Sequence, residues 1–211
     1  MFTARFAEQR CITSEEALRA VFGSGQLHLA AGASVSLNGE ISLAHDVSFS
    51  GACDIGDGTS IDTGTVLTNV RLGSGNRVRP YSILIDVDAG ERNLFGPFCF
   101  VRDGVIVADD CILGAHVEAT RSRFGSGVKI SHRAFVGDAD VGQGTIIGAG
   151  VVFCNWDGQG RQLTQVGANA VIGSGSLLVP PLAVGEAAVI AAGSTVTKDV
   201  SAHAKIIQKR V

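Results

Sequence analysis

Aliphatic residues recur at every sixth position in the C-terminal part of the chain, and this spacing constrains the fold most. Helices place apolar residues about 3.6 positions apart and simple strands roughly 2 apart, so neither explains the pattern. A hexapeptide β-helix does, because each flat side of a triangular coil contributes one inward aliphatic residue. A small residue follows four of the six, namely Gly167, Gly173, Gly185 and Ala191, which is typical of a tight corner. The six aliphatic residues are Val166, Ile172, Leu178, Val184, Ile190 and Val196.

The same period extends back to Leu29, with several changes of phase. It predicts an all-β, single-stranded, left-handed parallel β-helix of roughly nine or ten turns, each of about 18 residues. Residues 86–92 (DVDAGER) interrupt the period and predict a small loop. Residues 154–165 (CNWDGQGRQLTQ) abandon it entirely. A long excursion from a rigid coil usually carries function, so we expect the second segment to serve the site.

The N-terminal residues differ from the repeat. Residues 1–12 carry little signal, and Thr13-Ser14-Glu15-Glu16 then resembles a capping box before a short helix that ends ahead of Gly23. We expect this helix to cover the open edge of the first coil. The predicted division is an N-terminal segment at 1–26, a β-helix domain at 27–200 and a C-terminal tail at 201–211.

Composition narrows the function classes. Aromatic residues make up 6% of the chain, which we attribute to a coil too narrow for large rings. The net charge of −3 argues against general nucleic-acid binding. Apolar runs are shorter than a membrane span, and the N-terminus lacks the apolar core of a secretory signal. The five cysteines form no C-x-x-C pair, and we read Cys53, Cys99 and Cys111 as small core residues of a cytoplasmic protein.

Several motifs together carry a resemblance to a known family. From about Ser14 to Lys209 the chain resembles the C-terminal acetyltransferase domain of the bifunctional glucosamine-1-phosphate acetyltransferase/N-acetylglucosamine-1-phosphate uridylyltransferase. The uridylyltransferase domain has no counterpart in these 211 residues. The motifs are Gly96-Pro97-Phe98 with Arg102, Gly114 to Glu118, Lys129 to His132, Gly137-Asp138-Ala139, Ile147 to Gly150, Cys154 to Gly158, and Ile190 to Val200.

The resemblance implies an acetyl-CoA-dependent N-acetyltransferase that needs no metal. In it His132 is the general base that takes the amine proton, a task that suits an imidazole near neutral pH. Glu118 matches a carboxylate that orients or polarises this histidine. The Ala149 N–H matches the donor that binds the thioester oxygen as charge develops there. Three small residues match family positions that contact the acetyl-CoA co-substrate: Ala149, Ser174 and Ala192. Lys209 matches the position that binds the phosphates of the co-substrate.

The acceptor side departs from the family. The family binds its sugar phosphate with Arg, Lys, Tyr, Asn and Lys, and the matching residues here are Arg102, Thr120, Phe135, Ile146 and Arg161. Losing one cation and two polar groups should weaken phosphate binding unless something compensates, and Arg121 or Arg133 could partly substitute for the missing cation. These changes predict an amino sugar or amino-sugar phosphate that is not necessarily glucosamine 1-phosphate. Asn155 and Trp156 match a loop pair that reaches the neighbouring subunit's site.

Two other functions remain open from the residues alone. A non-catalytic scaffold or regulatory subunit would keep the coil and lose turnover, and the altered acceptor positions leave that possible. A γ-class carbonic anhydrase shares the coil but needs three histidines on zinc. His28, His45, His116, His132 and His203 lack the short spacing that it uses. The flat faces of such a coil predict association around an axis, and we expect a homotrimer.

Overall fold

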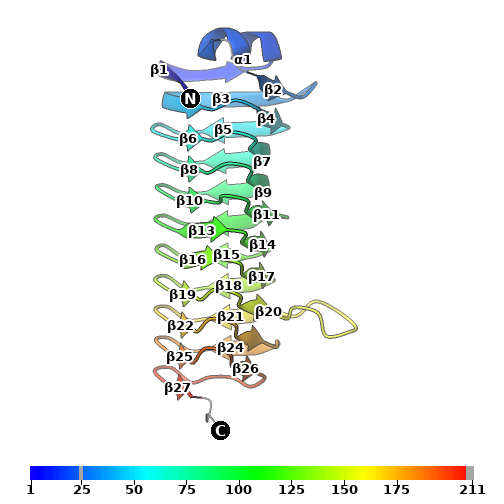
Figure 1. Cartoon of the computed structure of the whole chain (residues 1–211), viewed down its shortest axis with the longest axis vertical. Helices are drawn as coiled ribbons and strands as arrows, with labels where there is room; N and C mark the ends of the chain where they lie inside the picture. Colours follow the sequence, from blue (N-terminus) through cyan, green and yellow to red (C-terminus); the bar gives the residue numbers. More distant parts are fainter. Residues whose placement is uncertain (24–25, 208–211) are drawn as a thin grey trace.

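The computed structural model describes residues 1–23 and 26–207, which form one column of stacked triangular coils (Figure 1). About ten left-handed turns make up the column, with 27 strands and one helix among those residues. Strand pairs are parallel except for the pair of β1 and β3. The predicted hexapeptide β-helix is confirmed.

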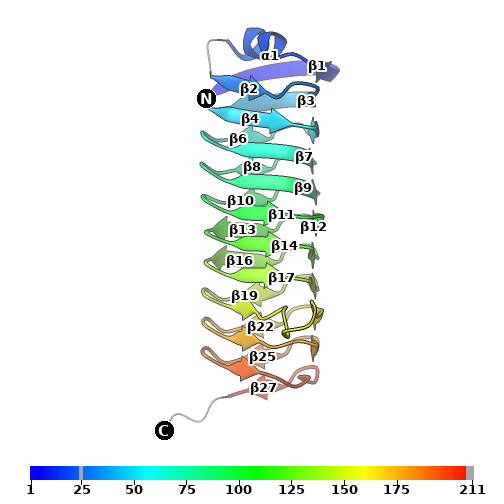
Figure 2. The ribbon, with the colours of Figure 1, turned by 90° about the vertical axis from the view of Figure 1, so that its right-hand side faces the viewer.

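The strands stack into three faces, which run the length of the column (Figures 1 and 2). The first face contains β6 (Ser60–Ile61), β8 (Arg77–Val78), β10 (Leu94–Phe95), β13 (Ile112–Ala115), β16 (Lys129–His132), β19 (Ile146–Ile147), β22 (Val171–Ile172), β25 (Val189–Ile190) and β27 (Lys205–Ile206). The second face contains β2 (Leu27–Leu29), β4 (Val47–Ser50), β7 (Val66–Leu72), β9 (Ile83–Ala89), β11 (Phe100–Arg102), β14 (Glu118–Thr120), β17 (Phe135–Gly137), β20 (Val152–Phe153), β23 (Leu177–Leu178) and β26 (Thr195–Val196).

The third face contains β3 (Ser34–Leu43), β5 (Ala52–Ile55), β12 (Val105–Val107), β15 (Arg123–Phe124), β18 (Ala139–Val141), β21 (Thr164–Val166) and β24 (Leu182–Val184). Two strands of the second face, β7 and β9, continue onto this face, because their C-terminal residues pair with β5 and β12. In the same way β3 continues onto the first face, where its last residues pair with β6.

The core is the predicted ladder of aliphatic residues. The six residues of the C-terminal repeat are each at most 5% exposed. They stack coil on coil, as Ile172 opposite Ile190 and Leu178 opposite Val196. Burial of each such side chain contributes about 1.5–3 kcal/mol. The expectation that large rings do not fit inside the coil is wrong, because Phe49, Phe95 and Phe153 are buried in it.

Small residues follow the core aliphatics because the next coil lies close to them. A Cβ added at Gly173 would lie 2.3 Å from the backbone nitrogen of Ala192, and one at Gly185 would lie 2.3 Å from that of Ala202. The turn itself comes two residues later, where Gly175 adopts a φ of 69°. The small residue after each core aliphatic therefore allows the next coil to stack closely, and the chain turns at the residue two positions later.

The loop predicted at residues 86–92 is wrong. Residues 83–89 form β9, in which Val87 and Ala89 are buried at 2% and 0% exposure. Asp86 makes the corner with a φ of 54°. Because this corner has one residue fewer, the inward apolar residues after it come one position earlier than the six-residue period requires. In the sequence this shift resembles a break in the period.

The N-terminal residues close the first coil with a strand as well as a helix (Figure 1). The helix α1 (Glu15–Phe22) begins as predicted, with the Ser14 hydroxyl accepting a hydrogen bond from the Ala17 N–H at 3.2 Å. The capping box is only half made, because the third helical residue is Ala17 and not a glutamate. Residues 2–12, which carried little sequence signal, form β1 (Phe2–Ile12) and pair antiparallel with β3. Strand β1 thus covers the sheet edge, and α1 packs on it.

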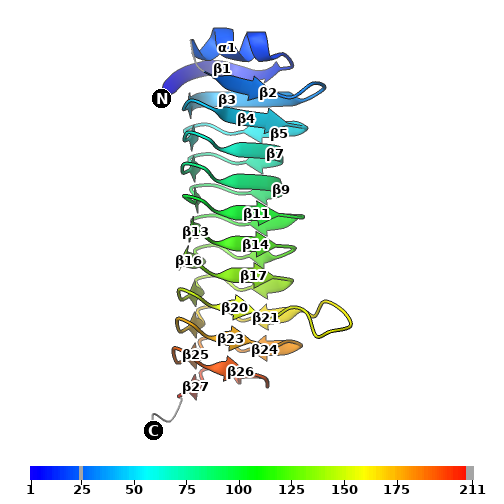
Figure 3. The ribbon, with the colours of Figure 1, turned by 45° about the vertical axis from the view of Figure 1, so that its right-hand side comes forward.

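The polar excursion lies where the sequence predicts it. β20 ends at Phe153 and β21 starts at Thr164, and the segment between them projects from the column (Figure 3). Cys53, Cys99 and Cys111 are buried in the core as predicted, and burial raises the pKa of the Cys99 thiol to about 11. No helix within 1–23 or 26–207 has the length and hydropathy to cross a membrane.

Candidate functional site

Four of the predicted catalytic and cofactor residues lie on one corner of the column. We call it the first corner, where the chain passes from the first to the second face. His132 is the register partner of Ala115. The carbonyls of Ala149 and Ser174 accept hydrogen bonds at 2.8 Å from Gly175 and Gly193 of the following coils. His132, Ala149, Ser174 and Ala192 therefore come from successive coils, as the resemblance requires.

The first corner changes character at His132. In each coil the residue that follows the position of His132 has a φ between 48° and 73°. It is glycine at Gly64 and then large in four consecutive coils, at Tyr81, Phe98, His116 and Arg133. Tyr81 stacks on Phe98 with ring centroids 5.6 Å apart, and Phe98 stacks on His116 at 5.2 Å. From the next coil onward the same position is glycine, at Gly150, Gly175 and Gly193. The corner is thus bulky from Tyr81 to Arg133 and bare beyond Arg133.

The predicted catalytic groups stand at this change. His132 ends β16 and is exposed, and its side chain has no hydrogen-bond or ion-pair partner in residues 1–23 and 26–207. The Ala149 N–H likewise donates to no backbone acceptor in the described part of the chain. An imidazole and an amide N–H from adjacent coils are therefore available at the end of the bare part of the corner.

A second corner, where the second face meets the third, carries a ladder of polar residues. Arg102 donates to Glu118 at 2.7 Å and pairs with Asp103. The Asp103 carboxylate also accepts from Arg121 at 3.1 Å. Arg121 binds both oxygens of Asp138, at 2.7 and 3.0 Å. One chain of charge-assisted hydrogen bonds thus connects three coils.

The ladder leaves little free positive charge. It combines the cations Arg102 and Arg121 with three carboxylates, Asp103, Glu118 and Asp138. The Thr120 hydrogen bond and the nearby arginines lower the pKa of Asp103. Burial raises the pKa of Asp138, but its hydrogen bonds from Arg121 and Asn155 outweigh this and leave it lowered. Both groups are therefore ionised at neutral pH.

The altered acceptor positions fall in different places. Thr120 is 1% exposed and lies inside the ladder, within 3.2 Å of Arg102 and 2.9 Å of Asp103. Phe135 lies on the second face between Glu118 and Val152, and its ring covers Gly137, where an added Cβ would approach it to 2.9 Å. Ile146 lies on the first face and is 46% exposed. Only Phe135 is adjacent to Glu118.

The loop of residues 154–163 holds the remaining predicted residues. Asn155 donates from its side chain to Asp138, so it joins its own chain's ladder. Trp156 is 60% exposed and forms an isolated bridge with Arg161. The structure thus brings Glu118, Arg102 and Asn155 into one network and places Trp156 and Arg161 on the projecting hairpin. Lys209 lies outside the described residues.

Sequence reasoning missed Asp103 and Asp138 as site residues and misjudged Arg121. The sequence offers Arg121 as a partial replacement for the missing phosphate-binding cation, but its guanidinium is held by Asp103 and Asp138. A signal existed, because a polar residue recurs where the chain turns after the second face. Its members are Asn69, Asp86, Asp103, Arg121, Asp138 and Asn155.

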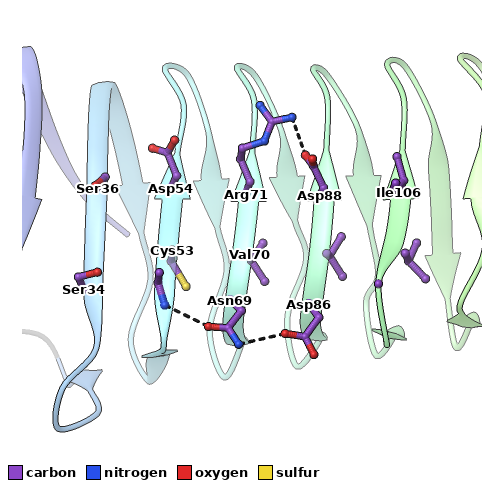
Figure 4. A pocket seen from close by; sticks show the side chains of 14 residues that line it. Ser34, Ser36, Cys53, Asp54, Asn69, Val70, Arg71, Asp86, Asp88 and Ile106 are labelled. Atoms are coloured by element: carbon purple, nitrogen blue, oxygen red, sulfur yellow. Dashed lines mark hydrogen bonds and ion pairs between the residues drawn. The ribbon is translucent and has the colours of Figure 1, made fainter.

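A separate groove lies on the third face in the N-terminal coils (Figure 4). Its volume is about 540 Å³, and its lining includes Ser36, Asp54, Asn69, Arg71 and Asp88. None of the predicted site residues lines it. Within the described ranges there is no group of three or more His, Cys, Asp or Glu side chains arranged to hold a metal ion.

Comparison with known proteins agrees with the repeat. Residues 164–198 match the family described as "Hexapeptide repeat of succinyl-transferase". The chain is 38% identical over 170 residues to the bifunctional protein GlmU of Acinetobacter baylyi, covering 78% of this chain and 37% of that protein. It is 36% identical over 204 residues to GlmU of Chromobacterium violaceum, covering 94% of this chain and 45% of that protein.

The chain spans less than half the length of these curated relatives. Among solved structures, the UDP-N-acetylglucosamine acyltransferase of Francisella novicida aligns with 86% of this chain and 65% of its own, at 16% identity and a TM-score of 0.47. Six-residue periodicity through the column, the repeat-family match and the GlmU similarity over most of the chain agree with one another. The chain is a hexapeptide-repeat β-helix that is similar, over most of its own length, to part of the GlmU proteins.

Proposed function

We propose that the chain transfers an acetyl group from acetyl-CoA to the amine of an amino sugar, with His132 as general base. The observation that carries this is the change of the first corner at His132. Beyond it, Ala149-Gly150, Ser174-Gly175 and Ala192-Gly193 offer three coils without large side chains, along which a thin pantetheine arm would lie. Its thioester end would then stop beside His132, because Arg133 and His116 occupy the corner ahead.

The chemistry follows from the two available groups. His132 takes the proton of the amine as its nitrogen attacks the thioester carbon. The carbonyl oxygen becomes negative and is stabilised by the Ala149 N–H. The C–S bond then breaks, the new amide forms, and coenzyme A leaves as a thiolate that takes the proton back from His132.

The acceptor follows from the charges of the ladder. We propose an amino sugar bound without a dedicated phosphate site, because Arg102 is already paired with Asp103 and Glu118. Thr120 is buried and Phe135 is apolar, so neither supplies the missing charge. Arg161, on the loop, has no carboxylate within salt-bridge distance in the described ranges.

The working unit is proposed to be a homotrimer with each site between two copies. Exposed large apolar side chains concentrate on the first corner and the two faces beside it, at Tyr81, Ile83, Phe98, Ile146, Val171 and Leu177. The described part of the third face has one, Ile106. Five cysteines without a partner sulfur favour a reducing, cytoplasmic setting.

The test is acetylation of glucosamine, glucosamine 1-phosphate and a UDP-linked amino sugar, followed by thiol release from acetyl-CoA. We expect turnover with an amino sugar and kcat/KM for the 1-phosphate no higher than for the others. A strong preference for the 1-phosphate would refute the acceptor assignment. A pure trimer that turns over none of these amines would instead favour the scaffold function.

A further inference from the structure

We propose that Arg121 and Asp138 are positioning residues, which hold the loop of residues 154–163 in place for the acceptor. The inference rests on the proposed acetyltransfer only for its kinetic consequence. Its structural part concerns how the loop is attached to the coil and is independent of any activity.

Asp138 is the point at which both ends of the loop meet the coil. Its carboxylate accepts a hydrogen bond from the Asn155 side chain, at the start of the loop. Its backbone carbonyl accepts at 3.0 Å from the N–H of Thr164, the first residue of β21, which follows the loop directly. Arg161 adds a favourable charge interaction that helps to lower the Asp138 pKa. No other coil residue in the described ranges makes a hydrogen bond to both Asn155 and Thr164.

The loop itself is a preformed hairpin, so its root decides where it points. The Asp157 carboxylate accepts from the N–H groups of Gln159 and Gly160, both at 2.8 Å, and from the Gln162 side chain at 2.7 Å. The two legs are joined where the Gln162 N–H donates to the Asn155 carbonyl at 2.8 Å. A hairpin that is rigid in itself transmits any movement of Asn155 to Trp156 and Arg161.

Arg121 holds the Asp138 carboxylate in one orientation. Two parallel hydrogen bonds, at 2.7 and 3.0 Å, fix the plane of the carboxylate. The remaining nitrogen of Arg121 reaches Asp103 at 3.1 Å, which in turn pairs with Arg102. The loop root and the Arg102–Glu118 pair are therefore held by one network. A lysine cannot reproduce this, because an ammonium is a point charge without a planar fork.

The same corner offers a matched control three coils earlier. Asn69 donates from its side chain to Asp86 at 3.0 Å, in the same left-handed backbone conformation, with φ values of 51° and 54° (Figure 4). That pair borders the third-face groove and touches no part of the loop. Asp86→Asn and Asp138→Asn are thus the same chemical change in the same kind of corner, and asparagine tolerates that backbone conformation.

The experiment is limited trypsin digestion of the intact full-length protein. Mass spectrometry follows cleavage after Arg161, which lies in the loop. We expect Asp138→Asn and Arg121→Lys to accelerate this cleavage about tenfold, because an opened loop is cut in proportion to its open population. Asp86→Asn should be cut at the wild-type rate. Equal rates in Asp138→Asn and the wild type, or equal acceleration in Asp86→Asn, would overturn the proposal.

A second experiment measures steady-state kinetics with the amino sugar that the wild type acetylates. Glucosamine and glucosamine 1-phosphate are the probes. Misplacement of the loop should lower kcat/KM for the acceptor about ten- to a hundredfold in Asp138→Asn. The KM for acetyl-CoA should stay within about twofold of the wild type, since the bare part of the first corner is untouched. A parallel rise of both KM values would contradict positioning. If the wild type acetylates neither probe, the proposed function fails while digestion still decides this inference.

Discussion

At the scale of single residues, His132 matters because of its neighbours on the first corner. It is one of five histidines, and exposure alone does not distinguish it. It stands where large corner residues give way to glycine, one coil away from the Ala149 N–H, which has no hydrogen-bond acceptor in the described part of the chain. Glu118, in contrast, has Arg102 as its hydrogen-bond partner, so a polarising role toward His132 stays a prediction.

His132→Ala should lower kcat about a hundred- to ten-thousandfold, the usual contribution of a general base. The fold should be unaffected, because the side chain is exposed and makes no hydrogen bond or ion pair within residues 1–23 and 26–207. Steady-state thiol release and thermal melting check the two statements. His28→Ala, an exposed histidine of β2 in the first coil, is the control and should keep wild-type turnover. A His132→Ala variant with near-wild-type kcat would remove the histidine from the mechanism.

At the scale of the repeating element, stacking depends on glycines whose Cβ would enter the next coil. Gly173→Ala should lower stability by about 1–3 kcal/mol, the usual cost of overpacking. For a chain of this size that corresponds to roughly 2–4 °C in Tm per kcal/mol. Gly160→Ala, at a position with no atom within 4 Å of an added Cβ, should leave Tm unchanged at the same protein concentration. Equal Tm values for the two variants would contradict the close-stacking explanation.

The loop should respond to acid and remain attached at neutral pH. Hydrogen bonds lower the Asp138 and Asp157 pKa values below 3.8. A lowered folded-state pKa contributes stability above the unfolded value, which is lost as pH falls through the folded one. Emission of Trp156, the one tryptophan of the chain, should therefore be constant from about pH 8 to about pH 4 and change below that. Asp138→Asn and Asp157→Asn separate the two carboxylates. A transition above about pH 5 with unchanged circular dichroism would contradict this assignment.

At the scale of the whole molecule, the distribution of exposed apolar residues predicts which faces associate. Val171 on the first face and Ile106 on the third face are both 37% exposed, so they form a matched pair. Val171→Glu should dissociate the proposed trimer in sedimentation equilibrium, because it would bury a charge between copies. Ile106→Glu should remain a trimer of 21.7 kDa chains. Dissociation by Ile106→Glu alone would place the interface on the third face.

Much of the coil could be read from the chain because each coil is a local repeat. One aliphatic residue in six points inward whatever the distant residues are, so Val166 to Val196 sufficed to predict the fold and its core. The same local rule placed the excursion at residues 154–165. It failed at Asp86, where a corner shortened by one residue changed the phase, and at β1, which lies outside the repeat and pairs antiparallel with β3.

Only the tertiary structure shows which residues of different coils interact with one another. Arg102, Arg121 and Asp138 are about 17 to 19 positions apart, one coil each, and nothing in the local pattern says that their side chains share hydrogen bonds. Stacking brings them within reach, since parallel strands lie about 4.8 Å apart. The residues that point into the core follow from the six-residue period. Which outward side chains lie next to one another depends instead on the exact length of every corner between them.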